Sequence, residues 1–273
     1  MHADDLLTRL SDPPRLTAAV ANALQAAAGV GTSFVTPAGD VAAASAVLFL
    51  LGRGDAGPGR AGEVGLVLNK RSRRVRQPGD LCCPGGGVSR VDFAAARLLA
   101  LPFGPFARWP HGRRWRRERP LEARWVALYL ATALREAFEE MRLNPVRVQL
   151  LGPLPPNRLS LFRRAIYPLA AWTSQRAGYR PNWEVDRIVH LPLSALLDPS
   201  RYVCYRVARP PGGPQRRPAF RLPGPGDGDI LWGATYRIVM DFMKIVFAFE
   251  APPLEGLPVV DGELAKSYLT GAP

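Results

Sequence analysis

The sequence contains few of the residues that build disulfide frameworks or thiolate metal sites. Its 273 residues include three cysteines and three histidines, and Cys82, Cys83 and Cys204 show no C-x-x-C spacing. This pattern excludes a disulfide-stapled secreted domain and a cysteine-ligated zinc site, so we expect free thiols in a reducing compartment. The sequence also has no apolar run long enough to cross a bilayer, and its first residues are acidic where a secretory leader would be basic. These absences predict a cytoplasmic protein with no membrane partner.

Acidic residues are in the minority. The 36 Lys and Arg residues exceed the 23 Asp and Glu residues, which gives a net charge of +13 and a pI near 10.6. Such an excess favours an anionic partner, such as a phosphate-bearing ligand or nucleic acid. The basic residues concentrate between Arg108 and Arg119, where arginines alternate with Trp109 and Trp115. Arginine and tryptophan together are typical of a nucleic-acid surface, but we favour the other interpretation, a disordered or loosely packed basic loop.

Helix and strand patterns alternate along the chain, and 47% of the residues are hydrophobic. These features predict a mixed α/β or α+β layer fold with a substantial core. The stretch from Asp4 to Ala28 is expected to be helical, with a break at Pro13-Pro14. The stretch from Arg206 to Gly228 is expected to be a loop. The predicted strands are Ala42 to Leu51, Glu63 to Leu68, Val146 to Leu151, Ile166 to Thr173 and Trp183 to Leu193, and a core helix is predicted from Gly233 to Phe249.

The stretch ATALREAFEEM, from Ala131 to Met141, carries the clearest chemical signal. Its composition favours a helix, and on a helix Glu136, Glu139 and Glu140 share one face because they stand at positions i, i+3 and i+4. Crowded carboxylates repel one another, whereas a hard divalent cation binds well to their oxygens. Arg135 stands close enough to orient one of these carboxylates. A solvated acidic face has the same pattern, so the neighbouring motifs decide between the two interpretations.

A glycine turn, CPGGGV from Cys83 to Val88, precedes this helix in the sequence. Glycines allow a backbone to approach a phosphate or a metal-bound water without a Cβ in the way. Gly86 is followed by five residues and then Asp92.

Together these residues resemble the Nudix box, which reads Gly, five residues, Glu, seven residues and R-E-U-x-E-E-x-G-U, where U is aliphatic. Asp92 replaces the first Glu, and Arg142 replaces the last Gly, which is expected to change how the helix ends. The seven-residue gap is extended to the stretch from Phe93 to Leu134, so an insertion of about 93–125 has to loop out for the site to form. Leu121 to Leu134 is expected to continue as a helix into the acidic stretch.

A second resemblance lies just before the box. The stretch from Val67 to Gly86 is similar to the additional motif of the coenzyme A pyrophosphatase branch, L-L-T-x-R-S-x-x-L-R-x-H-x-G-x-V-x-F-P-G-G. Ile230 to Tyr236, ILWGATY, resembles a further segment of the same branch. The matching positions of the first motif are Leu68, Arg71, Ser72, Arg76, Gly79, Pro84, Gly85 and Gly86, and the departures include Asn69, Pro78, Leu81, Cys83 and Ser89.

The resemblance implies a Nudix-type α/β/α sandwich with a mixed sheet. The Nudix domain would span residues 41–250, with an N-terminal helical arm at 1–40 and a C-terminal tail at 251–273. It also implies a pyrophosphohydrolase that uses Mg²⁺ or Mn²⁺ to cleave a nucleoside diphosphate derivative, with coenzyme A or acyl-coenzyme A as the leading small-molecule substrate. The oligomeric state stays open.

The same resemblance implies roles for individual residues. Glu139 and Glu140 would be the main metal ligands, and Glu136 would be a third ligand or the partner of the catalytic Arg135. Either Glu184 or Asp186, which point the same way on the predicted strand, would be a further ligand or the general base, although exposed charges without a role fit equally well. The substrate would be bound by Arg71, Ser72, Arg76, Gly85 and Gly86.

Two alternatives stay open at the level of the sequence. One is a Nudix enzyme that acts on RNA 5′ ends and uses the segment from Arg108 to Arg119 as a groove for the nucleic acid. The other is a catalytically silent Nudix fold that binds a ligand or nucleic acid. The intact Glu136, Glu139 and Glu140 argue against the silent module, because a binding module has no need of a carboxylate cluster.

Overall fold

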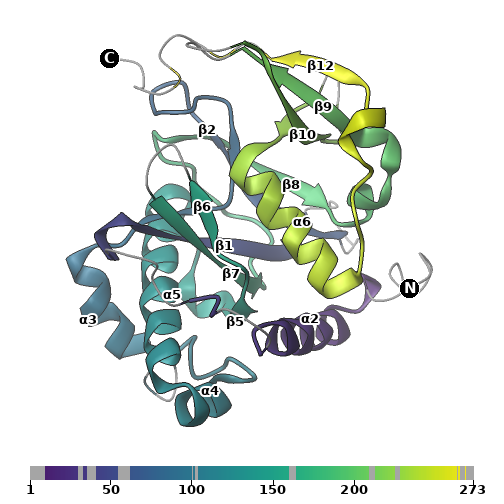
Figure 1. The fold of residues 1–273 in the computed structure, drawn as a ribbon. Coiled ribbons are helices and arrows are strands. Elements are labelled where there is room, and N and C mark those ends of the chain that lie inside the picture. The colour runs from purple at the N-terminus through teal and green to yellow at the C-terminus, as the bar shows by residue number, and fades with distance from the viewer. Residues whose placement is uncertain are drawn as a thin grey trace.

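The computed structural model describes residues 10–29, 33–35, 41–54, 62–99, 101, 104–159, 164–208, 213–224, 228–262, 264 and 268. Helices and strands alternate along the chain (Figure 1). The helices are α2 (Pro13–Ala27), α3 (Arg90–Leu99), α4 (Gly112–Glu118), α5 (Pro120–Met141) and α6 (Gly233–Phe247). The strands are β1 (Ala44–Arg53), β2 (Val64–Arg71), β3 (Leu81–Cys82), β4 (Gly85–Gly87), β5 (Val148–Pro153), β6 (Asn157–Leu159), β7 (Arg164–Thr173), β8 (Val185–Pro192), β9 (Tyr202–Val207), β10 (Gln215–Arg221), β11 (Ile230–Leu231) and β12 (Val259–Gly262).

The first predicted helix agrees with the structure where the structure describes it. A new helix, α2, begins at Pro13, and the side chain of Asp12 caps it by accepting a hydrogen bond from the Arg15 N–H at 3.2 Å. Proline is well tolerated at this first helical position because its missing N–H would have no partner there. The predicted break at Pro13-Pro14 is therefore confirmed, whereas residues 1–9 lie outside the described part.

The central sheet is mixed. Within the described residues it follows the order β3-β2-β1-β7-β5, with β8 beside β2, β4 beside β1 and β6 beside β7. β1 and β7 are parallel, whereas β1 and β2 form the predicted antiparallel pair, with Leu50 opposite Val67. The remaining pairs in this sheet are antiparallel.

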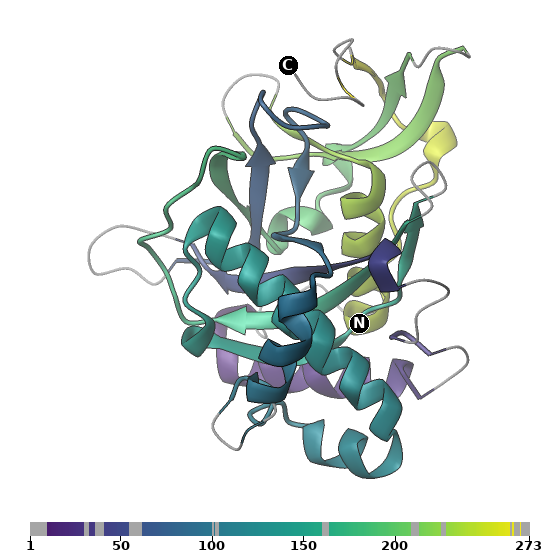
Figure 2. The same ribbon diagram turned by 90° about the vertical axis from the view of Figure 1, so that its left-hand side faces the viewer.

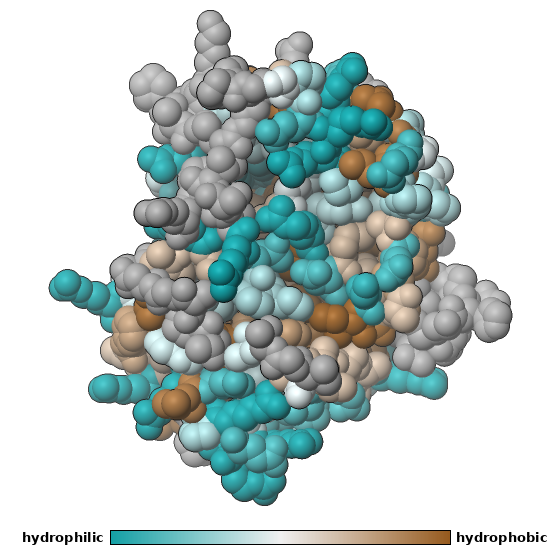
Figure 3. Space-filling view, viewed as in Figure 1, coloured by the Kyte–Doolittle hydropathy of each residue, from teal (hydrophilic) through white to brown (hydrophobic). Residues whose placement is uncertain are grey.

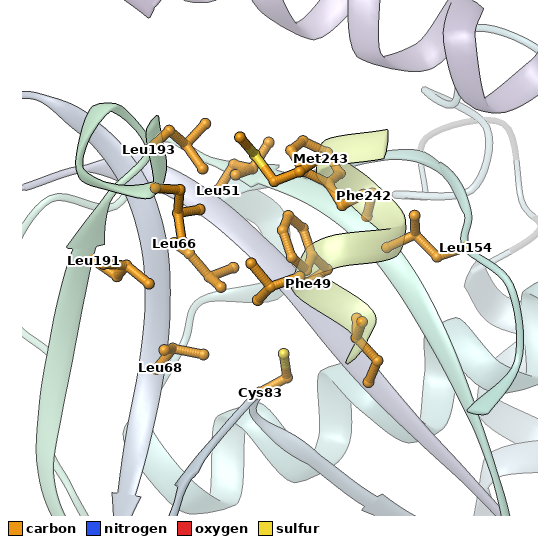
Figure 4. Packing of buried hydrophobic residues seen from close by; sticks show 14 of the residues in the cluster. Phe49, Leu51, Leu66, Leu68, Cys83, Leu154, Leu191, Leu193, Phe242 and Met243 are labelled. Atoms are coloured by element: carbon orange, nitrogen blue, oxygen red, sulfur yellow. The ribbon is translucent and has the colours of Figure 1, made fainter. Parts of the chain in front are cut away.

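Alternating side chains of β1 enter two separate cores. Phe49 and Leu51 join the cluster that contains residues of α2 and α6, and Phe49 stacks on Phe242 with a centroid distance of 4.3 Å (Figure 4). Leu48 and Leu50 point to the opposite face and join the cluster that contains α5. Both faces of the sheet are thus covered by helices, which confirms the predicted α/β/α sandwich with a mixed sheet.

A second sheet corrects the prediction of a loop between Arg206 and Gly228. In the described part of the chain, this sheet has the order β11-β10-β9-β12, and β12 is parallel to β9. Part of the predicted C-terminal tail is therefore a strand. The loop prediction was wrong because β10 has no alternating pattern: its first three residues are exposed, and its buried residues, Ala219 and Phe220, are adjacent.

Both interpretations of the basic insertion were also wrong in part. Trp109 and Trp115 are almost completely buried, and their rings lie 5.1 Å apart. The Trp109 indole donates to the Leu151 carbonyl at 3.0 Å, and the Trp115 indole donates to the Gln25 side chain at 2.5 Å. The described part of the insertion is thus packed, and its indoles cannot stack on bases. The basic side chains lie outside, where the surface around α4 is hydrophilic at the bottom of Figure 3; the exposed ones include Arg113, Arg114, Arg116 and Arg117.

The described cysteines are free thiols, as predicted. Burial raises the pKa of Cys82 to about 12, with a smaller contribution from the nearby Glu140 charge. A thiol with so high a pKa is not a nucleophile near neutral pH. No helix among the described residues is long and apolar enough to span a membrane.

Candidate active site

Helix α5 carries the acidic stretch and, as predicted, forms one continuous helix from Pro120 to Met141. It ends at Arg142, which adopts the left-handed conformation with φ 57°. The expected change in the helix end is therefore not observed. A side chain in this conformation costs roughly 1–2 kcal/mol, and the Arg142 guanidinium lies 4.8 Å from the Phe138 ring centroid, a cation–π contact that offsets part of this cost.

Asp92 and Arg135 join the two halves of the acidic motif. Asp92 lies in the first turn of α3, which packs against α5 (Figure 2), and its side chain is fully buried. The Arg135 Nε and Nη2 atoms donate to its two carboxylate oxygens at 2.8 and 3.1 Å. The Ser89 N–H and the Thr132 hydroxyl add bonds of 2.8 and 2.9 Å. The insertion therefore loops out, and the residues on either side of it meet.

Asp92 is the charged partner that fixes Arg135. Burial alone would raise the pKa of Asp92, but the hydrogen bonds from Arg135, Ser89 and Thr132 outweigh it and lower the pKa below its ordinary value. A buried carboxylate with this many donors remains ionised. Its partner Arg135 is thus held in place and also contacts Glu136, with Nη1 and Oε1 3.0 Å apart.

Glu140 is the most enclosed carboxylate of the helix. Its Oε2 atom accepts hydrogen bonds from the Asn69 side-chain amide at 2.9 Å and from the Gly85 N–H at 3.0 Å. Burial raises the pKa of Glu140 to about 8, and the charges of Glu136 and Glu184 contribute in the same direction. The Gly85 N–H and the charge of Arg71 oppose this rise.

Glu136 faces the glycine turn. A Cβ added to Gly86 would lie 2.4 Å from the Glu136 carboxyl carbon, so this position accommodates the carboxylate only as glycine. At Gly85, φ is +147° and an added Cβ would meet the backbone of β1. Burial raises the pKa of Glu136, Arg135 lowers it, and repulsion from Glu139 and Glu184 raises it further.

Glu139 and Glu184 occupy different positions around this cluster. Glu139 is about half exposed and accepts hydrogen bonds from Arg135 Nη1 at 3.3 and 3.5 Å. Glu184, just before β8, lies close enough to Glu136 and Glu140 to raise the pKa of both. Glu136, Glu140 and Glu184 thus influence one another's charge, and Glu139 lies beside Arg135.

The residues 71–80, between β2 and β3, form a basic turn that we call the arginine turn. The Arg71 Nε donates to the Arg76 carbonyl at 2.8 Å. The Ser72 hydroxyl donates to the Trp183 carbonyl at 2.8 Å, and the Ser72 N–H donates to the Glu184 carbonyl at 2.8 Å. Ser72 therefore fastens the arginine turn to the segment that carries Glu184.

The sequence was compared with family models and with known proteins. No family model matches the chain. Over 146 residues, 52% of this chain and 57% of the relative, it is 28% identical to "Uncharacterized Nudix hydrolase NudL" from Enterobacter sp. (strain 638). This similarity agrees with the resemblance of the sequence to the Nudix box, and the chain spans little more than half of that relative's length.

Solved structures of Nudix proteins show a distant likeness. The RenU hydrolase of M. smegmatis is 15% identical, with 54% of this chain and 68% of that chain covered at a TM-score of 0.32. A Nudix hydrolase from Alicyclobacillus acidocaldarius is 14% identical, with 60% and 84% covered at a TM-score of 0.36. A C. elegans Ap4A hydrolase is 13% identical, with 55% and 80% covered at a TM-score of 0.33.

The acidic cluster has the donor chemistry that a hard cation requires. In the described part of the chain, no three His, Cys, Asp or Glu side chains already form a ligand set, and Arg135, Asn69 and Gly85 donate hydrogen bonds to carboxylates of the cluster. Yet the Asn69 Oδ1 atom, beside Glu140, is buried and has no hydrogen-bond partner among the described residues. The clustered carboxylates raise one another's pKa, and a divalent cation relieves such repulsion. The residues therefore fit Mg²⁺ or Mn²⁺.

The clearest cavity of the described residues lies elsewhere and holds none of these carboxylates. It has a volume of about 380 Å³, and its lining includes Pro13, Pro110 and Trp172 but no charged side chain. The described residues of its lining offer no charge for a polyphosphate or a metal ion, so the carboxylate cluster is the better candidate for the site of reaction.

Sequence reasoning missed the contact of Asn69 with Glu140 and the pairing of Asp92 with Arg135. Asn69 appeared only as a departure from the branch motif, but a fully buried amide in an otherwise apolar strand is itself a signal of a polar partner. The spacing of Gly86 and Asp92 was recognised, whereas the partner of Asp92 was not, because 43 residues separate it from Arg135.

Proposed function

We propose that this protein is a Nudix-type, metal-dependent pyrophosphohydrolase that cleaves the diphosphate linkage of a nucleoside diphosphate derivative. One observation carries the proposal: the insertion loops out, so that Asp92 fixes Arg135 and the carboxylates of α5 lie against the glycine turn. An insertion that disrupted the motif would have separated these groups.

The chemistry follows from the difficulty of attacking a phosphoanhydride, whose charged oxygens repel a nucleophile. Mg²⁺ or Mn²⁺, when held by Glu136, Glu139 and Glu140, would supply charge neutralisation and a water of lowered pKa. Arg135 orients the helix carboxylates through its contact with Asp92. Glu184 stands beside the cluster as a further ligand or as the base that accepts the proton of the attacking water.

Substrate binding falls to the arginine turn and the glycine turn. Arg71 lies near enough to Glu140 to affect its pKa, and Arg76 is exposed. Guanidinium groups bind phosphates in a bidentate manner, and the backbone at Gly85 and Gly86 allows close approach. Coenzyme A or acyl-coenzyme A remains the leading substrate, supported by the motif resemblance from Val67 to Gly86.

The RNA 5′-end alternative loses its main support. It relied on Trp109 and Trp115 as stacking residues, and both indoles are buried and hydrogen-bonded within the protein. The exposed arginines that remain do not by themselves distinguish RNA from any other anion.

Product analysis tests the proposal. Coenzyme A, an ADP-sugar and a 5′-triphosphorylated RNA are incubated with the protein and Mg²⁺ or Mn²⁺, alongside Glu139→Gln and Glu140→Gln. We expect cleavage of coenzyme A at its diphosphate, giving a phosphorylated adenosine monophosphate and phosphopantetheine, and loss of this activity in both variants. Absence of cleavage of every substrate with either metal would contradict an enzymatic role and favour the silent binding module.

Adjacent glycines provide a sharper test of the site geometry. In Gly86→Ala the new Cβ displaces the Glu136 side chain, which is flexible, so we expect hydrolysis to fall on the order of 10- to 100-fold with little loss of stability. In the matched control Gly87→Ala, the nearest of the surrounding atoms is the Arg164 guanidinium at 3.7 Å, an ordinary contact. Steady-state rates and thermal unfolding of both variants check this prediction. Equal losses of activity in the two variants would show that Glu136 is not needed at this position.

A further inference from the structure

Tyr268, near the end of the chain, contacts the arginine turn at two points. Its hydroxyl donates to the Asp80 carboxylate at 2.5 Å, and its carbonyl accepts a hydrogen bond from the Gln77 N–H at 2.7 Å. The side chain is buried although Tyr268 stands 188 residues from Asp80 in the sequence. A residue outside the recognised motifs therefore contacts the arginine turn both at its end, Asp80, and at its tip, Gln77.

Asp80 connects three distant parts of the chain. Its second carboxylate oxygen accepts a hydrogen bond from the Trp232 indole at 3.1 Å, and its carbonyl accepts the Arg71 N–H at 2.9 Å. The Trp232 ring lies between those of Tyr205 and Tyr268, at centroid distances of 5.3 and 6.2 Å. Burial raises the pKa of Asp80, while the hydrogen bonds from Tyr268 and Trp232 lower it. These two donors, together with the charge of Arg71, oppose the effect of burial on the pKa of Asp80.

The tip of the arginine turn has a backbone conformation that needs external support. Gln77 has φ 55°, in the left-handed region that residues with a Cβ adopt at a cost of roughly 1–2 kcal/mol. The Tyr268 carbonyl holds the N–H of this residue. Without this hydrogen bond, the conformation of the arginine turn would be less stable.

We propose that Tyr268 is a positioning residue that fixes the arginine turn for binding an anionic substrate group beside the carboxylate cluster. The inference rests on the proposed function for the identity of the substrate. The contacts run from Tyr268 through Asp80 to Arg71, whose guanidinium is bonded to the Arg76 carbonyl. A turn that is already ordered loses less conformational entropy when it binds a phosphate. Loss of the hydrogen bond from Tyr268 to Asp80 should therefore weaken substrate binding more than it slows the chemical step.

The test compares the 273-residue chain with its Tyr268→Phe variant, which lacks only the hydroxyl that binds Asp80. The matched control is Tyr202→Phe, which removes a buried tyrosine hydroxyl that donates to Leu196 at 2.7 Å and does not touch the turn. We expect hydrogen exchange of the peptide 72–79 to become about 10-fold faster in Tyr268→Phe and to be unchanged in the control. KM for the cleaved nucleotide should rise about 3- to 10-fold, with kcat within about 2-fold of the wild type.

A second readout separates this inference from the proposed function. ADP binding, measured by calorimetry without metal, should weaken by a similar 3- to 10-fold factor in Tyr268→Phe, about 1 kcal/mol of binding free energy. Trp232→Phe, which removes the other donor to Asp80, should act in the same direction. Failure of the wild type to hydrolyse any nucleotide would sink the proposed function but leave this binding test intact. Unchanged exchange of the turn, unchanged ADP affinity, or no ADP binding at all would overturn the role of Tyr268.

Discussion

Replacing Glu140 with glutamine should lower the rate of diphosphate hydrolysis on the order of 10³-fold, because it removes the charge of the most buried carboxylate of the site. Glutamine keeps the volume, and its carbonyl oxygen can still accept the hydrogen bonds that Asn69 and Gly85 donate. The loss should therefore come from the missing charge and not from misfolding. Single-turnover rates at saturating Mg²⁺ or Mn²⁺ would measure it, with Glu255→Gln on the exposed surface as the control. A reduction of less than about 10-fold would remove Glu140 from the catalytic centre.

The same substitution should change the pH dependence of stability in metal-free buffer. Glu140 has a pKa of about 8 in the folded protein against an ordinary value of 4.5. The unfolded chain therefore releases this proton first, so the stability contributed by the protonated carboxyl is complete below about pH 4.5 and is lost as the pH rises through about 8.

Glu140→Gln has no proton to lose at this position. Its free energy of unfolding should rise relative to that of the wild type as the pH increases from about 5 to about 9. Glu255→Gln should show no such trend. Urea denaturation in the presence of a chelator would measure both differences. A constant difference between Glu140→Gln and the wild type across this range would mean that Glu140 is not desolvated in the folded protein.

Replacing Asp92 with alanine should destabilise the protein by about 2–4 kcal/mol, because it breaks a buried ion pair from one side. The Asp92 side chain is fully buried, and the change also leaves the Thr132 hydroxyl and the Ser89 N–H without this acceptor. Arg135 would lose its orienting partner, so hydrolysis should fall together with stability. Urea unfolding and steady-state rates of the same samples would measure both effects.

The control for Asp92 is Asp186→Ala. Asp186 is more than half exposed and lies 3.9 Å from the Arg187 guanidinium, so its removal should change stability by less than about 0.5 kcal/mol. The pKa of Asp92 is lowered in the folded protein, so its contribution is present above its ordinary pKa of 3.8 and is lost as the pH falls through the folded value. Similar costs for both substitutions would show that Asp92 does not hold the two halves of the motif together.

Local patterns predicted those parts of the protein that depend on neighbours in the sequence. The helix of α5 and the shared face of its carboxylates follow from spacings of three and four residues. The antiparallel pair of β1 and β2 follows from two apolar runs separated by a glycine-rich turn. These features are fixed by backbone geometry over a few residues, so a sequence is sufficient to read them.

The solvent exposure of side chains and the pairing of strands could not be predicted from local patterns. Trp109 and Trp115 have the pattern of a nucleic-acid surface, but whether an indole faces solvent depends on what packs over it, here α2, α5 and β5. The short strands β9 and β10 have weak patterns of their own and gain their order by pairing with each other and with β12. Tertiary packing overrides local propensity in both cases.

The sequence by itself determined which residues could form a Nudix-type site: Glu136, Glu139, Glu140, the glycine turn and the arginine turn. Only the tertiary structure decided that the site assembles, because the contacts that assemble it join residues far apart in the chain. Asp92 meets Arg135 across 43 residues, Asn69 meets Glu140 across 71, and Asp80 meets Tyr268 across 188. Such pairs depend on the burial that excludes water around them, and no local spacing encodes that burial.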